Sequence, residues 1–414
     1  MTQASCRRPP LQVSEYKRYG RQLILPEFGV GAQLSLKAAR VLVVGAGGLG
    51  CPAVQYLAAA GVGHLTVVDA DDIETSNLAR QVLHTDARVG VNKAESVREA
   101  VLTLNPHVEV APVRDAVTAQ NVRGLVRAHD VVLDCTDNVM TRYLLSDAAV
   151  LCGTPVVSAA AQGLEGHITV LHKDLGDGCR GPCYRCLFPS APRPEHTTSC
   201  DDGGILGVVT GLVGTMQAAE TIKLLAHMPG SQAAPTMVFV APFSAPPFRS
   251  VRLRGRQASC RACGDGSVSA PVCVDAEDYR TFCGLDADAP AGDVPQWPAA
   301  ALRAGIPPPR ILLDVRPAHE YAITALPASL NVPVDRIRAD PSAVLTALPG
   351  MDVDEGVQQV LVLCRRGQDS RAAARLLQAA EAQSRIPGRR RRAFMNVTGG
   401  LEAYARANPL FPMY

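Results

Sequence analysis

Short apolar runs alternate with amphipathic segments along the first half of the chain. The helix predicted over residues 49–60 ends at Gly61, and the helix predicted over 93–104 ends before Asn105-Pro106. The predicted strands cover residues 41–44, 65–69, 108–113, 130–133, 155–158 and 167–172. Because strands and helices alternate in this way, we expect a doubly wound α/β sheet.

Two longer segments follow this pattern. Residues 173–204 are irregular and rich in Gly, Pro and Cys, and a loop of that length in a compact domain is usually functional. Residues 205–225 are the most apolar long stretch, but they carry Thr210, Gln217, Glu220 and Lys223. This segment therefore predicts a buried amphipathic helix and no membrane span.

The last quarter of the chain has its own set of elements. Residues 284–309 are rich in Asp, Ala, Gly and Pro, which predicts a linker. Strands are expected at 311–315, 359–363 and 393–397, with helices at 370–382 and 401–407. The predicted organisation is an N-terminal extension over 1–14, a large α/β domain over 15–283, the linker over 284–309 and a smaller α/β domain over 310–414.

Composition narrows the class of protein. With 47% hydrophobic residues, the 414-residue chain can bury a sizeable core, and its net charge of +2 argues against a bulk electrostatic nucleic-acid binder. The N-terminus lacks the apolar core of a signal peptide. Thirteen cysteines in a long chain without a secretory signal indicate metal binding and catalysis rather than disulfides, so we expect a cytosolic protein.

The short arginine run at 389–392 is expected to be a solvated loop, although contact with RNA or an acidic partner stays open.

A glycine motif follows the first strand. Gly45, Gly47 and Gly50 form a GxGxxG pattern between a strand and a helix, where backbone N–H groups can approach a phosphate closely. Alone, this motif fits a nicotinamide or flavin enzyme equally well. Asp69 ends the next strand, where a carboxylate can bind ribose hydroxyls or simply cap the strand end.

Charged residues near the same sheet edge separate these possibilities. Arg80 and Lys93 supply two cations, which a dinucleotide oxidoreductase does not need but cleavage of a triphosphate does, because negative charge develops on the leaving pyrophosphate. Asp137 and Asn138 follow the strand predicted over 130–133. They could hold Mg²⁺, cap the next helix, or do both.

Four cysteines have the spacing of a metal site. Cys183 and Cys186 form one CxxC pair, and Cys260 and Cys263 form another. Together they predict a tetrahedral Cys₄ zinc site with no open position, and therefore a structural role. Two disulfides are the alternative.

Two further cysteines are candidate nucleophiles. Cys200 precedes the long apolar helix, and a helix N-terminus lowers a thiol pKa, although a buried inert cysteine fits equally well. Cys364 follows a strand and begins a short turn into a helix, so successive N–H groups can converge on its sulfur, with Arg365 and Arg366 adding positive charge. A structural cysteine and a phosphatase loop are the alternatives for Cys364.

Several motifs between about Glu15 and Cys263 closely resemble those of the ubiquitin-activating-type adenylyltransferases, MoeB among them. The matching segments are RYGRQ at 18–22, GAGGLGCP at 45–52, SNLARQ at 76–81, Lys93-Ala94 and DCTDN at 134–138. The resemblance implies zinc at the four cysteines above, an acyl-accepting role for Cys200, and a homodimer in which Arg21 reaches the ATP of the other subunit. The residues implied to contact ATP or its Mg²⁺ are Gly48, Asp69, Ser76, Asn77, Leu78, Ala79, Arg80, Lys93, Asp137 and Asn138.

The C-terminal part resembles a rhodanese domain, which carries sulfur as a cysteine persulfide. The resemblance rests on the Cys364 loop, Leu313-Asp314-Val315-Arg316 and Gly399-Gly400-Leu401. Gln368 stands where Asn is common, and the usual Gly-His before Asn331 is missing. The fused order is similar to the eukaryotic adenylyltransferase–sulfurtransferases that serve molybdopterin synthase and tRNA thiolation. The expected fold is a Rossmann-like adenylating domain with a structural zinc site, followed by a smaller α/β rhodanese domain.

This resemblance implies a function. ATP would activate the C-terminal glycine of a ubiquitin-like sulfur carrier, and the Cys364 persulfide would convert the adenylate into a thiocarboxylate. The implied partners are carriers ending in Gly-Gly and a sulfur donor, either a cysteine desulfurase or thiosulfate, with no membrane and no stable nucleic-acid binding. A nicotinamide-linked oxidoreductase and a non-catalytic carrier-binding scaffold are the alternatives. The choice of carriers, the donor, the exact chemistry of Cys200, and the roles of Cys283 and of Arg389–Arg392 stay open.

Overall fold

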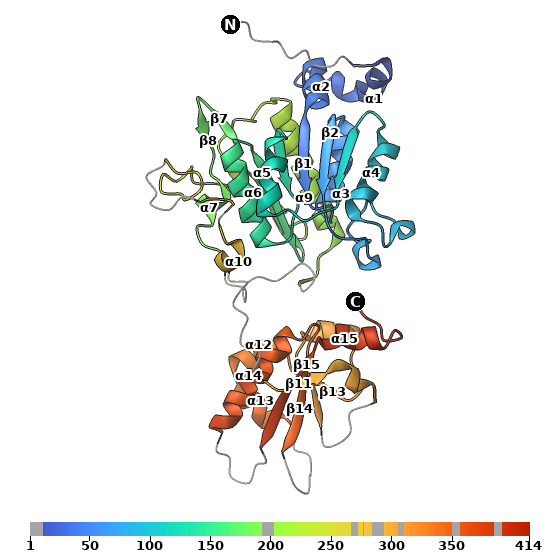
Figure 1. The fold of residues 1–414 in the computed structure, drawn as a ribbon, viewed down its shortest axis with the longest axis vertical. Coiled ribbons are helices and arrows are strands. Elements are labelled where there is room, and N and C mark those ends of the chain that lie inside the picture. Colours follow the sequence, from blue (N-terminus) through green and yellow to red (C-terminus); the bar gives the residue numbers. More distant parts are fainter. Residues whose placement is uncertain are drawn as a thin grey trace. The chain divides into compact units, whose positions relative to one another are not determined.

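The computed structural model divides into two compact units, Met1–Ala287 and Asp288–Tyr414 (Figure 1). The structure describes residues 11–192, 203–265, 272–275, 277–283, 294–304, 310–349, 357–384 and 391–414. Cys200 and residues 389–390 of the arginine run lie outside these ranges. Each unit has its own sheet and its own hydrophobic core, so each is described by itself.

Unit 1 contains an eight-stranded sheet in the order β10-β9-β6-β5-β4-β1-β2-β3. The five strands from β5 to β3 are parallel, whereas β6, β9 and β10 extend the sheet by antiparallel pairing. The strands are β1 (Arg40–Val44), β2 (His64–Val68), β3 (Glu109–Val113), β4 (Val131–Asp134), β5 (Val156–Gln162), β6 (Glu165–Leu171), β9 (Thr236–Val240) and β10 (Phe248–Arg252). The predicted doubly wound sheet is confirmed.

Helices cover both faces of this sheet because its central strands are apolar on both faces. In β1, Val41 and Val43 belong to one core cluster, and Leu42 and Val44 belong to another, as the two-residue period of a strand requires. The first cluster is formed with α2 (Gly29–Ala38), α3 (Gly50–Ala60), α4 (Lys93–Leu104) and α9 (Gly207–Leu225), and the second with α5 (Ala119–Arg127) and α6 (Val139–Cys152). The helix α1 (Val13–Leu23) precedes α2.

The segment expected to be irregular over 173–204 contains short elements where it is described. These are β7 (Asp174–Gly176), paired with β8 (Cys179–Arg180), and α7 (Tyr184–Leu187). Other short elements of this unit are η1 (Thr75–Asn77), η2 (Asp86–Arg88) and α10 (Tyr279–Phe282). Across the described ranges, no helix has both the length and the apolar character needed to span a membrane.

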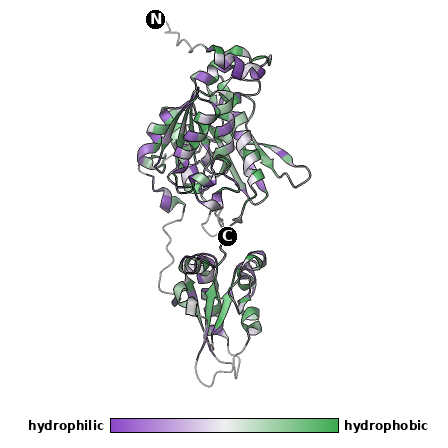
Figure 2. Cartoon of the chain, turned by 90° about the vertical axis from the view of Figure 1, so that its right-hand side faces the viewer, coloured by the Kyte–Doolittle hydropathy of each residue, from purple (hydrophilic) through white to green (hydrophobic). Residues whose placement is uncertain are grey.

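Unit 2 contains a parallel five-stranded sheet in the order β11-β15-β14-β12-β13. Its strands are β11 (Gln296–Pro298), β12 (Ile311–Asp314), β13 (Ser329–Asn331), β14 (Gln358–Leu363) and β15 (Arg392–Thr398). The helices α12 (Val334–Ala339), α13 (Pro341–Ala347) and α14 (Gln368–Gln383) pack in one core cluster, and η4 (Ala299–Ala304) and α15 (Gly400–Ala407) pack in the other. The short helix α11 (Ala318–Ile323) lies between β12 and β13 in the chain. Figure 2 shows green, hydrophobic strands between helices that carry both colours.

The structure differs from the predicted linker over 284–309. Within that range, β11 pairs with β15, and Leu302 of η4 is buried in the core of unit 2. The composition of the segment concealed this element because Pro and Ala surround its few large apolar residues, Trp297 among them. Residues 284–293 and 305–309 lie outside the described part.

Candidate functional site

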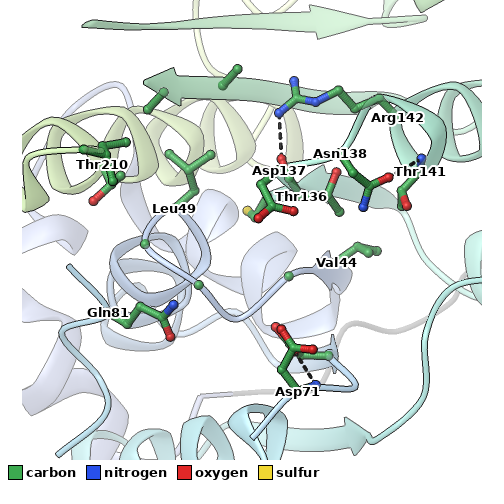
Figure 3. A pocket seen from close by; sticks show the side chains of 18 of the residues that line it. Val44, Leu49, Asp71, Gln81, Thr136, Asp137, Asn138, Thr141, Arg142 and Thr210 are labelled. Atoms are coloured by element: carbon green, nitrogen blue, oxygen red, sulfur yellow. Dashed lines mark hydrogen bonds between the residues drawn. The ribbon is translucent and has the colours of Figure 1, made fainter. Parts of the chain in front are cut away.

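A cavity of about 1140 Å³ lies in unit 1, where the central parallel strands end (Figure 3). This is the edge at which open α/β sheets bind ligands. Of the residues predicted to contact nucleotide, seven line it: Gly48, Asp69, Asn77, Arg80, Lys93, Asp137 and Asn138. Ser76, Leu78 and Ala79 belong to the same segment but do not line the cavity, and neither does Arg21, which is exposed on α1.

The loop between β1 and α3 requires glycine at two positions. Gly45 has φ +97°, and a Cβ there would lie 2.6 Å from the carbonyl oxygen of Cys135. A Cβ on Gly50 would lie 2.0 Å from the carbonyl oxygen of Gly45. The loop is therefore folded back tightly, and Gly47 and Gly48 form part of the cavity wall.

Asp69 braces this loop. Its carboxylate accepts the Ala46 N–H at 2.7 Å and the Asp71 N–H at 2.9 Å. Burial raises the pKa of Asp69, and the hydrogen bond from Ala46 and the charge of Lys93 act in the opposite direction. Asp69 therefore has a structural role in holding the loop, and it also lines the cavity, where its contact with a ligand stays a prediction.

The two predicted cations line the same cavity. Arg80 donates to the carbonyl of Ser76 at 3.0 Å. Lys93 is buried, and its Nζ lies 2.8 Å from a carboxylate oxygen of Asp71. Asp71 was not among the predicted residues; the acidic run at 69–72 after β2 was the sequence signal for it.

The two predicted residues after β4, Asp137 and Asn138, make different contacts. Asn138 caps α6, since its side chain accepts the Thr141 N–H at 2.8 Å. Asp137 is exposed and lines the cavity. The capping alternative therefore holds for Asn138, and the carboxylate of Asp137 remains turned to solvent beside the site.

A buried arginine missed by the sequence analysis supports this segment. Arg142 donates to the carbonyl of Thr136 at 2.6 Å and lies 3.8 Å from a carboxylate oxygen of Asp134 (Figure 3). Asp134 in turn accepts the Thr136 hydroxyl at 2.7 Å. Because Arg142 is four residues into a helix, only the fold reveals that it reaches back to the strand end.

Part of the cavity wall is aromatic. Tyr184, Phe188 and Phe239 line it, together with His167. Burial lowers the pKa of His167 to about 4, so its ring is neutral at pH 7. No sequence motif marked these residues, because they come from separate segments of the chain: α7 and the residue after it, β6, and β9.

The four predicted metal ligands converge. The sulfur atoms of Cys183, Cys186, Cys260 and Cys263 are buried and lie within 4.8 Å of one another. Three of their separations are 3.3, 3.5 and 3.8 Å. Four thiolates placed tetrahedrally about 2.3 Å from zinc would have sulfur atoms about 3.8 Å apart, so the cluster fits this ion. It does not fit two disulfides, because none of these cysteines is bonded to another.

Cys364 lies in a turn of unit 2 between β14 and α14. Its sulfur accepts the Gly367 N–H at 3.0 Å and lies 3.2 Å from the Ser370 hydroxyl, which also lies 2.7 Å from Oδ1 of Asn396. Burial raises the pKa of Cys364, and these two donors act against that effect. The predicted convergence of donors on the sulfur is present, but the resting thiol is mostly protonated at neutral pH.

The turn is held from behind by α15. The N–H groups of Leu401 and Glu402 donate to the carbonyls of Cys364 and Arg365 at 2.9 and 3.0 Å. Gly400 has φ +59°, and a Cβ there would lie 2.4 Å from both carbonyl oxygens. Arg366 is paired with Glu402 at 3.0 Å.

The model of the ThiF family matches residues 19–262, which is more than half of the chain and includes the whole cavity. The chain belongs to the ThiF family. A rhodanese-like domain matches residues 298–407, around the Cys364 turn. These two catalytic domains make the chain an enzyme of adenylation and sulfur transfer, and adenylation by a ThiF domain uses ATP.

Relatives of this ThiF-family chain match it over nearly its whole length, across both of its domains. The protein named adenylyltransferase and sulfurtransferase MOCS3 from Drosophila yakuba is 42% identical over 96% of this chain and 84% of its own length. The adenylyltransferase and sulfurtransferase UBA4 from Yarrowia lipolytica is 40% identical over 98% of this chain and 97% of its own length. Among solved structures, E. coli MccB is 22% identical, with a TM-score of 0.48 over 59% of this chain and 70% of that one.

Proposed function

We propose that the chain adenylates the C-terminal glycine of ubiquitin-like sulfur carriers and then converts it into a thiocarboxylate. The carriers would be the small subunit of molybdopterin synthase and a ubiquitin-related modifier, for molybdenum cofactor synthesis and 2-thiolation of tRNA wobble uridines. The observation that carries this proposal is the presence of two sites on one chain: a cavity with a glycine loop and two cations, and a thiol in an anion-stabilising turn. The names of the relatives support the same pair of activities.

In the first step, a carboxylate oxygen of the carrier attacks the α-phosphorus of ATP. A bond forms between this oxygen and phosphorus, and the bond to the bridging oxygen breaks, so pyrophosphate leaves. Arg80 and Lys93, which both line the cavity, would stabilise the charge that develops on it. Asp137 would hold Mg²⁺, which, when bound, neutralises phosphate charge.

In the second step, the terminal sulfur of a Cys364 persulfide attacks the activated carbonyl carbon. AMP leaves, and the carrier is then joined to Cys364 through a disulfide. A second thiol must cleave this S–S bond to release the thiocarboxylate, which leaves a protein disulfide for an external thiol to reduce. Cys200 is proposed for this role, or for transient acceptance of the acyl group.

Further parts of the proposal concern the assembly. The Cys₄ cluster would hold a structural zinc ion that joins α7 to residues 260–263. A homodimer would bring Arg21 of one subunit to the ATP of the other, in keeping with its exposed position on α1. A cysteine desulfurase or thiosulfate would load Cys364, and the protein would act in the cytosol without a stable nucleic-acid partner.

The test is mass spectrometry of carrier proteins ending in Gly-Gly, incubated with the chain, ATP and a sulfur donor. We expect the carrier to gain the mass of AMP less one water without donor, and to exchange one oxygen of its terminal carboxylate for sulfur when donor is present. Binding of NAD in place of ATP would instead support the oxidoreductase alternative. Carrier binding without any change in mass would support the scaffold alternative.

A further inference from the structure

The carbonyl group of Ala46, in the middle of the glycine loop, is turned into the protein. Two donors meet it there: His84 Nε2 at 3.0 Å and Cys51 Sγ at 3.3 Å. A carbonyl oxygen can only accept a hydrogen bond, so Nε2 of His84 must carry the proton. His84 is 5% exposed, which places this contact behind the cavity wall.

The other ring nitrogen of His84 is also engaged. Its Nδ1 lies 3.0 Å from the hydroxyl of Ser96, which must donate because Nδ1 has no proton. Arg88 donates to the same hydroxyl at 3.2 Å. A chain of donors therefore runs from Arg88 through Ser96 and His84 to Ala46, and it fixes the tautomer. Burial lowers the pKa of His84, which keeps the ring neutral.

The direction of the Ala46 carbonyl sets the direction of the next N–H group. In a trans peptide the C=O and the N–H point in opposite directions, so the Gly47 N–H is directed away from His84. Gly47 lines the cavity, whereas Ala46 does not. Within the described ranges, no residue accepts a hydrogen bond from the Gly47 N–H.

Both backbone polar groups of Ala46 are thus held, and they belong to the two consecutive peptides on either side of its Cα. Asp69 accepts the Ala46 N–H at 2.7 Å, and His84 binds the Ala46 carbonyl at 3.0 Å. A flip of the Ala46–Gly47 peptide would lose the contact with His84 and turn the Gly47 N–H away from the cavity.

We propose that His84 is a positioning residue for ATP, because it holds the Ala46–Gly47 peptide with the Gly47 N–H directed at the bound phosphates. This inference rests on the proposed binding of ATP in the cavity. His84 does not line the cavity, so it acts through the loop and contacts no substrate.

Two substitutions of His84 test this role, because both introduce an amide and differ only in how far its nitrogen reaches. His84→Gln places an amide nitrogen the same number of bonds from the backbone as Nε2, so it can still donate to Ala46. His84→Asn places its amide nitrogen at the position of Nδ1 and cannot reach. The matched control is His129→Asn: His129 is also buried, between the Leu125 carbonyl and the Thr66 hydroxyl, but it does not touch the loop.

The measurements are the Kd of ATP by calorimetry and the KM and kcat of ATP–pyrophosphate exchange with carrier present. We expect His84→Asn to raise the Kd and KM for ATP roughly five- to tenfold, with kcat nearly unchanged, as for the loss of one buried hydrogen bond. His84→Gln should restore both to within about twofold, and His129→Asn should lower thermal stability without moving the KM.

Equal affinities for ATP in the wild type and in His84→Asn would overturn the inference. So would weak ATP binding by a His84→Gln variant whose thermal stability matches that of the wild type. If His84→Asn does not fold, Ser96→Ala replaces it, because without the Ser96 hydroxyl the tautomer of His84 is no longer fixed. Ser96→Ala must then raise the KM for ATP, and His84→Gln must not. An unchanged KM in Ser96→Ala refutes the role. Failure of the wild type to bind ATP would instead refute the proposed function.

Discussion

At the residue scale, two opposed effects set the pKa of the Cys364 thiol. Burial raises its pKa, whereas the hydroxyl of Ser370 and the N–H of Gly367 lower it. Because the thiolate is the form that attacks a sulfur donor, its supply depends on pH. The same donors would stabilise the anionic persulfide once it has formed.

We expect the rate at which Cys364 is loaded with sulfur to rise with pH from neutral into the alkaline range. Removing the Ser370 hydroxyl takes away a group that lowers the thiol pKa, so Ser370→Ala should shift the rising limb to higher pH. Stopped loading reactions followed by mass spectrometry measure the rate, with Ser342→Ala on α13 as an exposed control. A loading rate that does not change with pH would contradict the raised pKa.

Asp137 and Asn138 provide a second prediction at this scale. Asp137→Ala should abolish ATP–pyrophosphate exchange while sulfur loading of Cys364 continues, because the two reactions use different units. Asn138→Ala should cost about 1 kcal/mol through loss of the α6 cap and retain measurable exchange. Near-normal exchange in Asp137→Ala would exclude a role for this carboxylate in binding metal.

At the scale of elements, each strand and helix predicted with bounds has a counterpart close to those bounds, but α1, α2, β9 and β10 were among the elements not predicted. The helix over 93–104 agrees with α4 at both ends, because Asn92 caps its first turn and Asn105-Pro106 ends it. β11 was missed because a three-residue strand has too few positions to show a two-residue period. Contacts such as Arg142 with Thr136 depend on how an element packs, and spacing along the chain does not show them.

The Cys₄ cluster acts between elements, so its loss should affect a whole segment. We expect about one zinc ion per chain, and expect Cys183→Ser to remove it together with part of the thermal stability, since structural zinc binding is coupled to folding. Metal analysis and thermal unfolding are the measurements. The control is Cys152→Ser, whose sulfur lies outside the cluster. Protein purified without chelator that contains no zinc would refute this assignment.

At the scale of the whole molecule, the chain joins two separately folded sheets, each with one reactive site. The sequence indicated both sites because their loops are short and continuous in the chain, as in the Gly45–Gly50 and Cys364–Ser370 segments. It could not show the aromatic wall or the support behind each loop, because these come from distant segments. Apart from the predicted linker, which contains β11 and η4, the domain boundaries stay predictions, and so do the roles given to individual site residues.

Two sites on separate sheets should be separable by mutation. Cys364→Ala should still form the carrier adenylate but no thiocarboxylate, because the described part of the chain holds no second thiol in a comparable turn. Cys200→Ala should be milder, keeping adenylation and some sulfur transfer. Single-turnover mass spectrometry of the carrier distinguishes them. Thiocarboxylate formed by Cys364→Ala at the wild-type rate would refute the rhodanese assignment, and loss of adenylate in Cys200→Ala would place Cys200 in the nucleotide or carrier site.

The contact between Gly400 and the carbonyls of Cys364 and Arg365 has a genetic consequence. No side chain fits at this position, so every missense change there would distort the sulfur turn while leaving intact the glycine loop, which belongs to the other unit. Such alleles would separate the two activities of one gene. Cells carrying them would accumulate adenylated carrier and lack its sulfur, a phenotype that differs from that of a null allele and that could be complemented in trans by a second copy mutated only at Asp137.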